Sequence, residues 1–587
     1  MDRKSIIVLV ASFALLFGWF QLVPKLYPPI PKPHLTNTLA AATNQLATGT
    51  TTNGTAPQPS ALTELPGNLA APIVPAGAPQ IEKLDTGDAI YTFTSHGGGL
   101  KEVELKKYPA TVGRGSAKKG TPAEFAALNA RALTPILALR GGDALMGDNL
   151  FALTRVSPTT LRAEKTLSNG VVVVKTFQYT SNNLMKASVR LENRSGQAVP
   201  LPAYSVSAGT SALMEPADPE RFLGVYWFDG AKTAKADPTW FDNKQFCVSG
   251  VPRPLFTVGA SNILWAAAPN QFFTLALIVS TNDIAEQLHV LRVPLPRDDR
   301  GRVGKLQHPY GYEANLIYPP ALIAPGQAVE RAFTLYAGPK EYKTLARVAP
   351  QLDAVMDLGM FHWFAKGLLL SMNGLYAIIP NYGLSIILIT VIIKLLFWPL
   401  TQASTKSMKR MQTLQPQMKA LQEKYKDDPA KMNKKLMEFM KENKVSPMGG
   451  CLPMLLQIPV FIGFYQMIQC AIELRGVPFL WASDLSKPDT VGYLFDFPIN
   501  PLPLIMGVTM LWQAQMTPPS PGMDPGQQKI MKYMPLIFLF MLYNFSSGLT
   551  LYWTVQNLLT IAQMKLTKAQ SPVAAPAHTL PPPKKKK

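Results

Sequence analysis

The chain has 587 residues, of which 47% are hydrophobic and 16% charged, and its formal net charge is +20. This mixture is typical of a membrane protein that carries a substantial soluble portion. The three cysteines and six histidines form no CxxC, Cys/His or HExxH pattern and no GxxxxGK[ST] loop occurs, which excludes a disulfide framework, the common zinc sites and a P-loop nucleotide site.

The N-terminus carries an apolar run from Ser5 to Val23, which predicts a transmembrane anchor over residues 1–24. The run is longer than the core of a signal peptide and no small-residue cleavage site follows it directly, so we expect the anchor to remain uncleaved. Arg3 and Lys4 predict a cytoplasmic N-terminus, so the chain emerges on the far side. Residues 25–80, rich in Thr, Ala, Pro and Asn, predict a flexible linker there.

Residues 81–345 show alternating apolar and polar positions and repeated turn signals, which predict an all-β sandwich domain. The strongest signal is Asn169-Gly170 between two strand-like runs, which predicts a hairpin. A set of aromatic residues, Tyr226-Trp227-Phe228 with Trp240-Phe241, offers a ligand groove as one interpretation. Packing in the sheet core is the favoured one, and we assign this domain no chemistry.

The next stretch leads into the membrane. Residues 346–380 predict a connecting helix followed by an amphipathic helix lying in the membrane interface. Residues 381–400 are almost wholly apolar and predict a transmembrane helix that contains one charge, Lys394. A lysine at bilayer depth costs roughly 3 kcal/mol near the helix centre. It therefore either serves a function or extends its side chain to the membrane surface, about 9 Å away along the helix at Leu400.

Residues 401–447 are polar and predict two antiparallel helices joined by a turn at Asp427-Asp428-Pro429. Eleven Lys/Arg against five Asp/Glu mark this hairpin as cytoplasmic. Its methionines, among them Met411, Met418 and Met437, fit seam packing between the helices. The alternative is an adaptable surface for apolar clients, because methionine repacks easily.

The remaining sequence predicts four more transmembrane helices, two loops and a basic tail. The helices are expected at 448–473, 501–517, 529–545 and 548–567, the loops at 474–500 and 518–528, and the tail at 568–587. With six crossings and a cytoplasmic N-terminus, every strongly basic segment and the C-terminus lie in the cytoplasm. The positive charge is therefore first a topology signal, and attraction to ribosomal RNA or anionic lipid comes second.

Amide side chains recur within these apolar segments. Gln457 and Gln513 lie in two of them, and Gln556 and Asn557 lie in the last. In lipid such groups need partners or water. Each one alone fits ordinary interhelical hydrogen bonding, at about 0.6 kcal/mol. Their number, together with Lys394, favours a hydrated groove.

The C-terminal part resembles the YidC/Oxa/Alb family of membrane protein insertases, in the Gram-negative form that carries a large periplasmic domain. Five motifs occur in family order over about residues 361–568, and they begin at Ser446-PMGGCLPMLLQIPVF, Glu473-LRGVPFLWASDL, Met506-GVTM, Asp524-PGQQKIMKYMPLIF and Ser547-GLTLYW. The resemblance implies a polytopic α-helical protein of six transmembrane helices, five of them forming the insertase core, plus the periplasmic β domain.

The resemblance also implies a hydrophilic intramembrane groove that is open to the cytoplasm. Lys394 matches a positive family position that is most often arginine, and Thr390 matches a threonine one turn earlier. Tyr552 and Trp553 match a tyrosine pair, so the second hydroxyl is missing here. Gln457 and Gln513 are expected to line the same groove. No carboxylate lies within the core of any crossing, so Lys394 has no evident permanent counter-ion.

The function implied is insertion and folding of nascent inner-membrane proteins, with no enzyme activity, catalytic residue, metal or cofactor. The expected partners are nascent membrane proteins, a Sec-type translocon, the ribosome and membrane lipids, and the expected location is the bacterial inner membrane. Two other functions fit an embedded lysine or a large exported domain: a secondary transporter with an anion site at Lys394, and an envelope scaffold. Against the transporter, no internal repeat or second embedded charge is visible.

Overall fold

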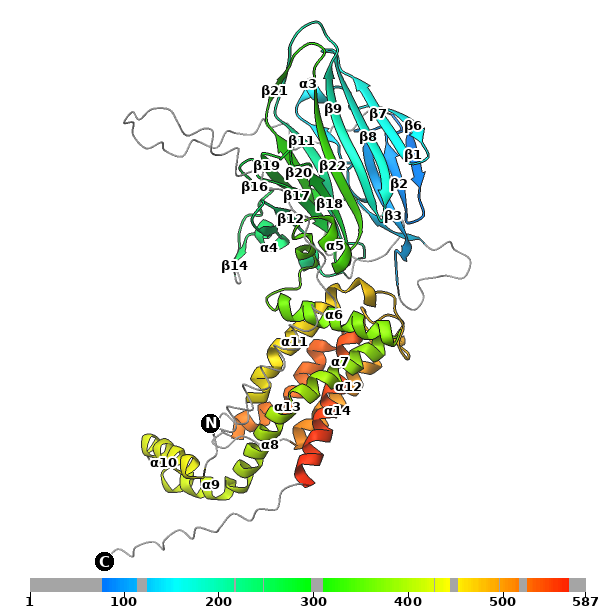
Figure 1. Cartoon of the computed structure of the whole chain (residues 1–587). Helices are drawn as coiled ribbons and strands as arrows, with labels where there is room; N and C mark the ends of the chain where they lie inside the picture. Colours follow the sequence, from blue (N-terminus) through cyan, green and yellow to red (C-terminus); the bar gives the residue numbers. More distant parts are fainter. Residues whose placement is uncertain are drawn as a thin grey trace, which may run out of the picture. The chain divides into compact units, whose positions relative to one another are not determined.

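The computed structural model describes residues 77–112, 124–215, 218–245, 248–296, 310–426, 428–443, 452–495, 497–516 and 525–569. The expected anchor at 1–24, most of the linker, most of the basic tail and much of the 518–528 loop lie outside these residues. The chain divides into two compact units, a sheet unit and a helical unit, which meet in sequence between Leu358 and Gly359. Residues 469–473 belong to the sheet unit, and the two units are described separately (Figure 1).

The largest element of the sheet unit is a nine-stranded antiparallel sheet. Across the sheet the strands are β13 (Thr233–Ala236), β12 (Val225–Phe228), β17 (Trp265–Pro269), β18 (Phe273–Val279), β22 (Ala328–Pro339), β9 (Leu184–Asn193), β8 (Val171–Ser181), β7 (Thr160–Thr166) and β6 (Ala152–Ser157). The hairpin predicted at Asn169-Gly170 is confirmed, since β7 pairs with β8 and Thr166 lies opposite Val172. Gly170 has a φ of 80°, which glycine adopts without strain.

Two further antiparallel sheets complete this unit. The five-stranded sheet runs β16 (Leu255–Val258), β19 (Gln287–Pro294), β20 (Tyr310–Tyr318), β11 (Tyr204–Ser211) and β5 (Leu139–Arg140). The four-stranded sheet runs β1 (Ile81–Asp85), β2 (Ala89–Thr94), β3 (Gly99–Pro109) and β4 (Phe125–Leu128). All three contribute to one hydrophobic core, through side chains such as Phe93, Leu275 and Leu316. The prediction of an antiparallel β domain is therefore confirmed.

Minor elements fill the connections between the sheets. They are the strand pairs β10 (Val199–Leu201) with β21 (Ala321–Ile323) and β14 (Lys244–Gln245) with β15 (Val248–Ser249), and the short helices α3 (Asp143–Met146), η1 (Glu220–Phe222) and α4 (Pro238–Asp242). Of the five aromatic residues singled out, Tyr226, Trp227, Phe228 and Phe241 are buried. Trp240 is half-buried and packs against Phe241 and Phe256, at 5.0 and 4.8 Å between ring centroids. They pack in the interior of this unit, as the favoured interpretation expected.

The prediction of one continuous connecting helix ahead of the membrane is wrong. The structure has two short helices, α5 (Tyr342–Val348) and η2 (Leu352–Met356). Pro350 separates them, because it lacks an N–H and forces Ala349 into an extended conformation (φ −154°, ψ 157°). Trp265 Nε1 donates to the Pro350 carbonyl at 2.9 Å. Both helices thus belong to the sheet unit, which extends to residue 358 rather than 345.

The helical unit contains α6 (His362–Ile378), α7 (Tyr382–Leu396), α8 (Trp398–Thr413), α9 (Gln415–Lys424), α10 (Pro429–Glu442), α11 (Leu452–Cys470), η4 (Ile472–Leu474), the strands β23 (Gly492–Leu494) and β24 (Phe497–Ile499), α12 (Pro501–Met516), α13 (Pro525–Leu542) and α14 (Ser547–Ala569). η4 begins within residues 469–473 of the sheet unit. No single helix among the described residues is both long and apolar enough to span a membrane on its own. The pair Tyr382–Leu396 and Trp398–Lys406 meets that test together, across a 60° bend.

This bend replaces the straight helix expected over residues 381–400. α7 ends at Leu396, and α8 begins at Trp398 and continues beyond residue 400. Pro399 has no N–H to bond the carbonyl of Leu395, and its ring clashes with the turn before it. The backbone N–H of Phe397, at the end of α7, makes the ordinary helical bond to the carbonyl of Ile393 and also bonds the carbonyl of Leu395.

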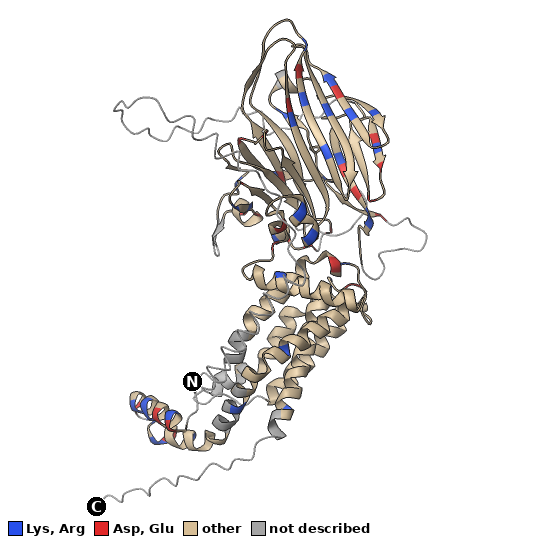
Figure 2. Cartoon of the chain, viewed as in Figure 1, with Lys and Arg blue, Asp and Glu red and all other residues tan. Residues whose placement is uncertain are grey.

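Several helices of the helical unit have an apolar surface, unlike the helices of a soluble domain. Large side chains are exposed on several helices, among them Leu395 (61%), Val508 (65%), Ile537 (62%) and Phe540 (88%). Within the bounds of α6, α7, α8, α11, α12, α13 and α14 the sequence contains no aspartate or glutamate. In Figure 2 the coloured parts of these helices show no acidic residue, in contrast to α9 and α10.

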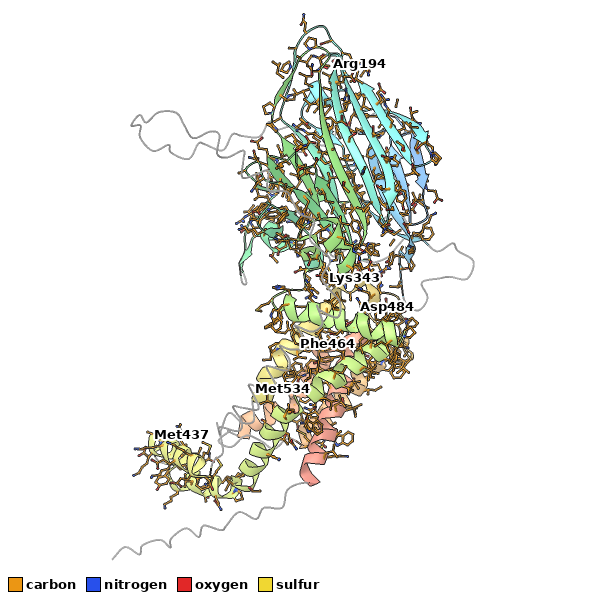
Figure 3. The ribbon with its side chains drawn as sticks, in the orientation of Figure 1. Arg194, Lys343, Met437, Phe464, Asp484 and Met534 are labelled. Carbon is orange, nitrogen blue, oxygen red and sulfur yellow. The ribbon has the colours of Figure 1, made fainter. Side chains whose placement is uncertain are left out.

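The predicted pairing of two helices in the polar hairpin is confirmed for α9 and α10. Their seam consists of Leu414, Met418, Leu436 and Met440. Met418 is 1% exposed and so packs in the seam, whereas Met437 is 66% exposed (Figure 3). The side chain of Met411 lies outside the described residues.

Candidate functional site

One face of α14 carries four polar side chains, Tyr552, Gln556, Thr560 and Gln563. Their spacing of four, four and three residues places them in one row on the helix. We call this row the α14 polar stripe. Tyr552 and Gln556 form hydrogen bonds with a side chain of α11. Thr560 bonds a side chain of α7, and Gln563 bonds a side chain of α8.

Lys394, in the last turn of α7, is turned toward this stripe. Its side chain is 6% exposed, and Nζ donates to the Thr560 hydroxyl at 2.8 Å. The Thr560 hydroxyl in turn donates to the backbone carbonyl of Gln556 at 2.7 Å. The hydroxyl oxygen of Thr560 is therefore oriented to accept from Lys394. Within the described part of the chain Lys394 forms no ion pair. The structure thus gives the ammonium one neutral partner in the interior of the unit.

The second contact of the stripe is with α11. Gln457 Nε2 donates to the Tyr552 hydroxyl at 3.1 Å, and Gln556 Nε2 donates to Gln457 Oε1 at 3.2 Å. Tyr552 is 2% exposed and its ring stacks on Phe464 at 4.1 Å between centroids. Lys394 and Gln457, which the sequence analysis singled out on different helices, therefore meet the same face of α14.

The other residues singled out from the sequence lie outside this row. Trp553 points to a different face of α14, where it contacts Phe461 (4.5 Å between centroids) and Phe538 (5.8 Å). Thr390 is fully buried and its hydroxyl donates to the Ile386 carbonyl of its own helix at 2.6 Å. Gln513 lies on α12, where it is partly exposed.

Three residues of the site were missed by sequence reasoning. Thr560 is the partner of Lys394, and Gln563 Nε2 donates to the Thr401 hydroxyl at 2.6 Å. The signal for Thr560 and Gln563 was present, because both continue the helical spacing that begins at Tyr552 and Gln556. Thr401 gave no signal, since a threonine after an apolar helix has no distinctive pattern.

The site as a whole is polar, cationic and without acid. It contains hydroxyls, amides and one ammonium, all of which can donate a hydrogen bond, and the helices α6 to α8 and α11 to α14 supply no carboxylate. Among the described residues, no cluster of three or more His, Cys, Asp or Glu side chains could hold a metal ion. The arrangement can therefore accept a carboxylate or a polar peptide backbone.

Comparisons with known proteins identify the family of the chain. The family model described as 60Kd inner membrane protein matches residues 374–573, and the model of the YidC periplasmic domain matches residues 83–370. A membrane protein insertase YidC of Pelobacter propionicus is 34% identical, covering 96% of this chain and 98% of the relative. One of Geotalea daltonii is 33% identical over the same shares of the two chains.

A solved structure described as an active YidC insertase is 18% identical, with a TM-score of 0.33, covering 84% of this chain and 93% of that one. The family assignment rests on the two family models and on the sequence relatives. The chain belongs to the YidC family of membrane protein insertases, which are inner membrane proteins with a periplasmic domain and are not enzymes.

Proposed function

We propose that Lys394 and the α14 polar stripe line a hydrated intramembrane groove, open to the cytoplasm, that receives polar segments of nascent membrane proteins. The observation that carries this proposal is the position of Lys394. Its ammonium is buried, has a threonine hydroxyl as its hydrogen-bond partner, and lies in a set of helices that contain no carboxylate. A charged residue inside a membrane-spanning segment is costly and commonly marks a functional site.

A client supplies the missing charge. An acidic residue in the segment that must cross the membrane pairs with Lys394, and the amides of Gln457 and Gln556 replace water at its peptide groups. Pairing and hydration lower the cost of moving this segment partway into the membrane. The apolar helix of the client then leaves sideways into lipid, driven by the burial of about 20 apolar residues. No covalent bond changes.

The orientation follows the charge pattern of the sequence. We propose six transmembrane helices, with both termini and the α9–α10 hairpin in the cytoplasm, because every strongly basic segment then faces that side. This topology agrees with the periplasmic domain that the family comparison assigns to residues 83–370. We further propose a Sec-type translocon and the ribosome as partners, the latter through the basic hairpin and tail.

The test is a charge series at Lys394 in cells depleted of the native insertase. Lys394→Arg should retain insertion, whereas Lys394→Ala and Lys394→Glu should fail for clients with an acidic translocated segment. A charge pair at about 4 Å with an effective dielectric constant of about 20 is worth up to about 4 kcal/mol, so the loss should exceed tenfold. Insertion is measured by protease protection of the client.

Two controls isolate the charge. Lys366→Glu changes another lysine of an apolar helix, α6, and should leave insertion unchanged. A client whose translocated segment has its acidic residues replaced by serine should become insensitive to Lys394→Ala. Normal insertion of the acidic client by Lys394→Glu would contradict the proposal.

A further inference from the structure

The segment between α11 and α12 folds into a small hairpin with an apolar tip. The strands β23 and β24 pair with Leu494 opposite Phe497. Four large side chains of this hairpin are exposed: Tyr493 (72%), Leu494 (59%), Phe495 (96%) and Phe497 (58%). So many exposed aromatic and aliphatic groups on so few residues mark an interaction surface.

The hairpin is held firmly at its base. The Tyr543 hydroxyl, just past the end of α13, donates to the Pro498 carbonyl at 2.7 Å, and its ring stacks on Phe497 at 5.0 Å between centroids. Asn500 is buried, and its Nδ2 donates to the Tyr543 carbonyl at 2.9 Å. The tip therefore has a fixed place beside α13, and its exposure is a property of the fold.

The apolar tip continues the apolar surface of α13. Ile537, Phe540 and Met541, in the last turns of this helix, are 62%, 88% and 56% exposed. They precede Tyr543, to which the hairpin is attached. In a protein of the inner membrane such a surface faces lipid, so the hairpin extends the lipid-facing surface beyond the end of the helix.

The hairpin lies at the end of the helical unit where the chain arrives from the periplasmic domain. α6 follows that domain, and Phe364 in its first turn packs against Gly463 in the C-terminal half of α11. Phe479, which comes shortly after α11, packs against Gly383 at the start of α7. Figure 3 labels Asp484, another residue of this segment, near α6 and α7. This end is therefore the periplasmic one.

We propose that the β23–β24 hairpin is a lipid anchor, whose side chains Tyr493, Leu494 and Phe495 insert into the headgroup region of the periplasmic leaflet. Aromatic side chains favour that depth, where a phenol keeps its hydroxyl in water while the ring is buried. The anchor fixes the depth of the periplasmic ends of α12 and α13.

The test places a nitroxide label at Phe495→Cys in the full chain, with Cys247 and Cys451 changed to serine and the buried Cys470 kept. The protein is reconstituted in vesicles of phosphatidylethanolamine and phosphatidylglycerol. The matched control is Val251→Cys, an apolar residue that is 82% exposed in the sheet unit. Collision with oxygen and with a water-soluble nickel chelate is measured for both labels.

The expected result is a higher oxygen-to-nickel accessibility ratio at position 495 than at position 251. Adding Leu494→Ser and Tyr493→Ser should lower that ratio, because the hairpin then has fewer apolar groups to insert. Neither side chain bonds the base of the hairpin, so the hairpin should stay folded. An aqueous label at position 495 in these lipid-only vesicles would overturn the proposal in favour of a protein partner. This inference rests on membership of an inner membrane family and not on the groove at Lys394, so failure of the charge series would leave it standing.

Discussion

Two buried lysines, one in each unit, show how the surroundings of a residue decide what it does. Lys394 bonds one hydroxyl among helices that lack acid. Lys175, on β8, is fully buried; its Nζ donates to the Gly97 carbonyl at 2.6 Å and lies 4.5 Å from the centre of the Phe151 ring. Neither has a carboxylate partner among the described residues. Lys175 is enclosed in the interior of a sheet domain, so we assign it a structural effect only.

That structural effect should depend on pH. Burial, with added repulsion from Lys165, lowers the pKa of Lys175 to about 7 from its usual 10.5. Between these values the unfolded chain holds the proton and the folded chain does not, so stability rises with pH. Above about pH 7 the free energy of unfolding should rise by at most about 1.4 kcal/mol per pH unit. Below that pH Lys175 is charged in both states, and its full cost to stability is present.

Lys175→Met should remove this rise. Urea unfolding of the sheet domain, followed in the full chain between pH 6 and pH 9.5, should give a flatter stability profile for the variant than for the wild-type chain. Lys186→Met, an exposed lysine on the neighbouring strand β9, is the control and should keep the wild-type slope. Parallel profiles for wild type and Lys175→Met would show that Lys175 is already charged when folded.

At the scale of the element, the sequence predicted a hairpin and the helices well but missed two places where a helix breaks. The turn at Asn169-Gly170 and the apolar runs predicted a hairpin and the helices, because turn chemistry and helical spacing are written in consecutive residues. The break at Pro350 and the bend at Phe397 were missed, although the first is a proline and Pro399 follows the second by two residues. At both places the apolar residues keep their helical spacing, and spacing alone does not indicate that a helix changes direction.

The candidate site divides in the same way. Lys394 and Gln457 stood out because a charge or an amide is rare in an apolar helix. Their partners were not predictable, since which face of α7 or α11 meets α14 depends on packing among helices far apart in sequence. The β23–β24 hairpin was read only as a loop, because its strands are three residues each and too short for an alternating pattern.

The α9–α10 hairpin gives a prediction that separates packing from client contact. Met418→Ala should destabilise the hairpin by about 2 kcal/mol, because it opens a cavity in the four-residue seam. Met437→Ala should leave its stability unchanged, since the side chain is 66% exposed. Hydrogen exchange of the amides of residues 415–442 in the full chain measures both effects. Equal protection in the two variants would mean that the seam does not hold the hairpin together.

At the scale of the whole molecule, the residues of the proposed groove all lie in one of the two units. The sheet unit has its own core, built from three sheets, while Lys394, Gln457 and the α14 polar stripe all belong to the helical unit. Among the described residues, those before Gly359 supply nothing to the proposed groove. Insertion should therefore depend on the helices, and the periplasmic domain should contribute to other tasks.

Deleting residues 81–338 and joining the ends with a glycine-serine linker tests this separation. The shortened chain should keep most of its insertion activity in depleted cells, because the apolar helices and their polar stripe are intact. Adding Lys394→Glu to the deletion should abolish insertion of clients with an acidic translocated segment, as in the full chain. This second variant matters because it shows that the remaining activity runs through the same site. A deletion that loses insertion while the protein still reaches the membrane would instead assign the essential role to the periplasmic domain, as a scaffold requires.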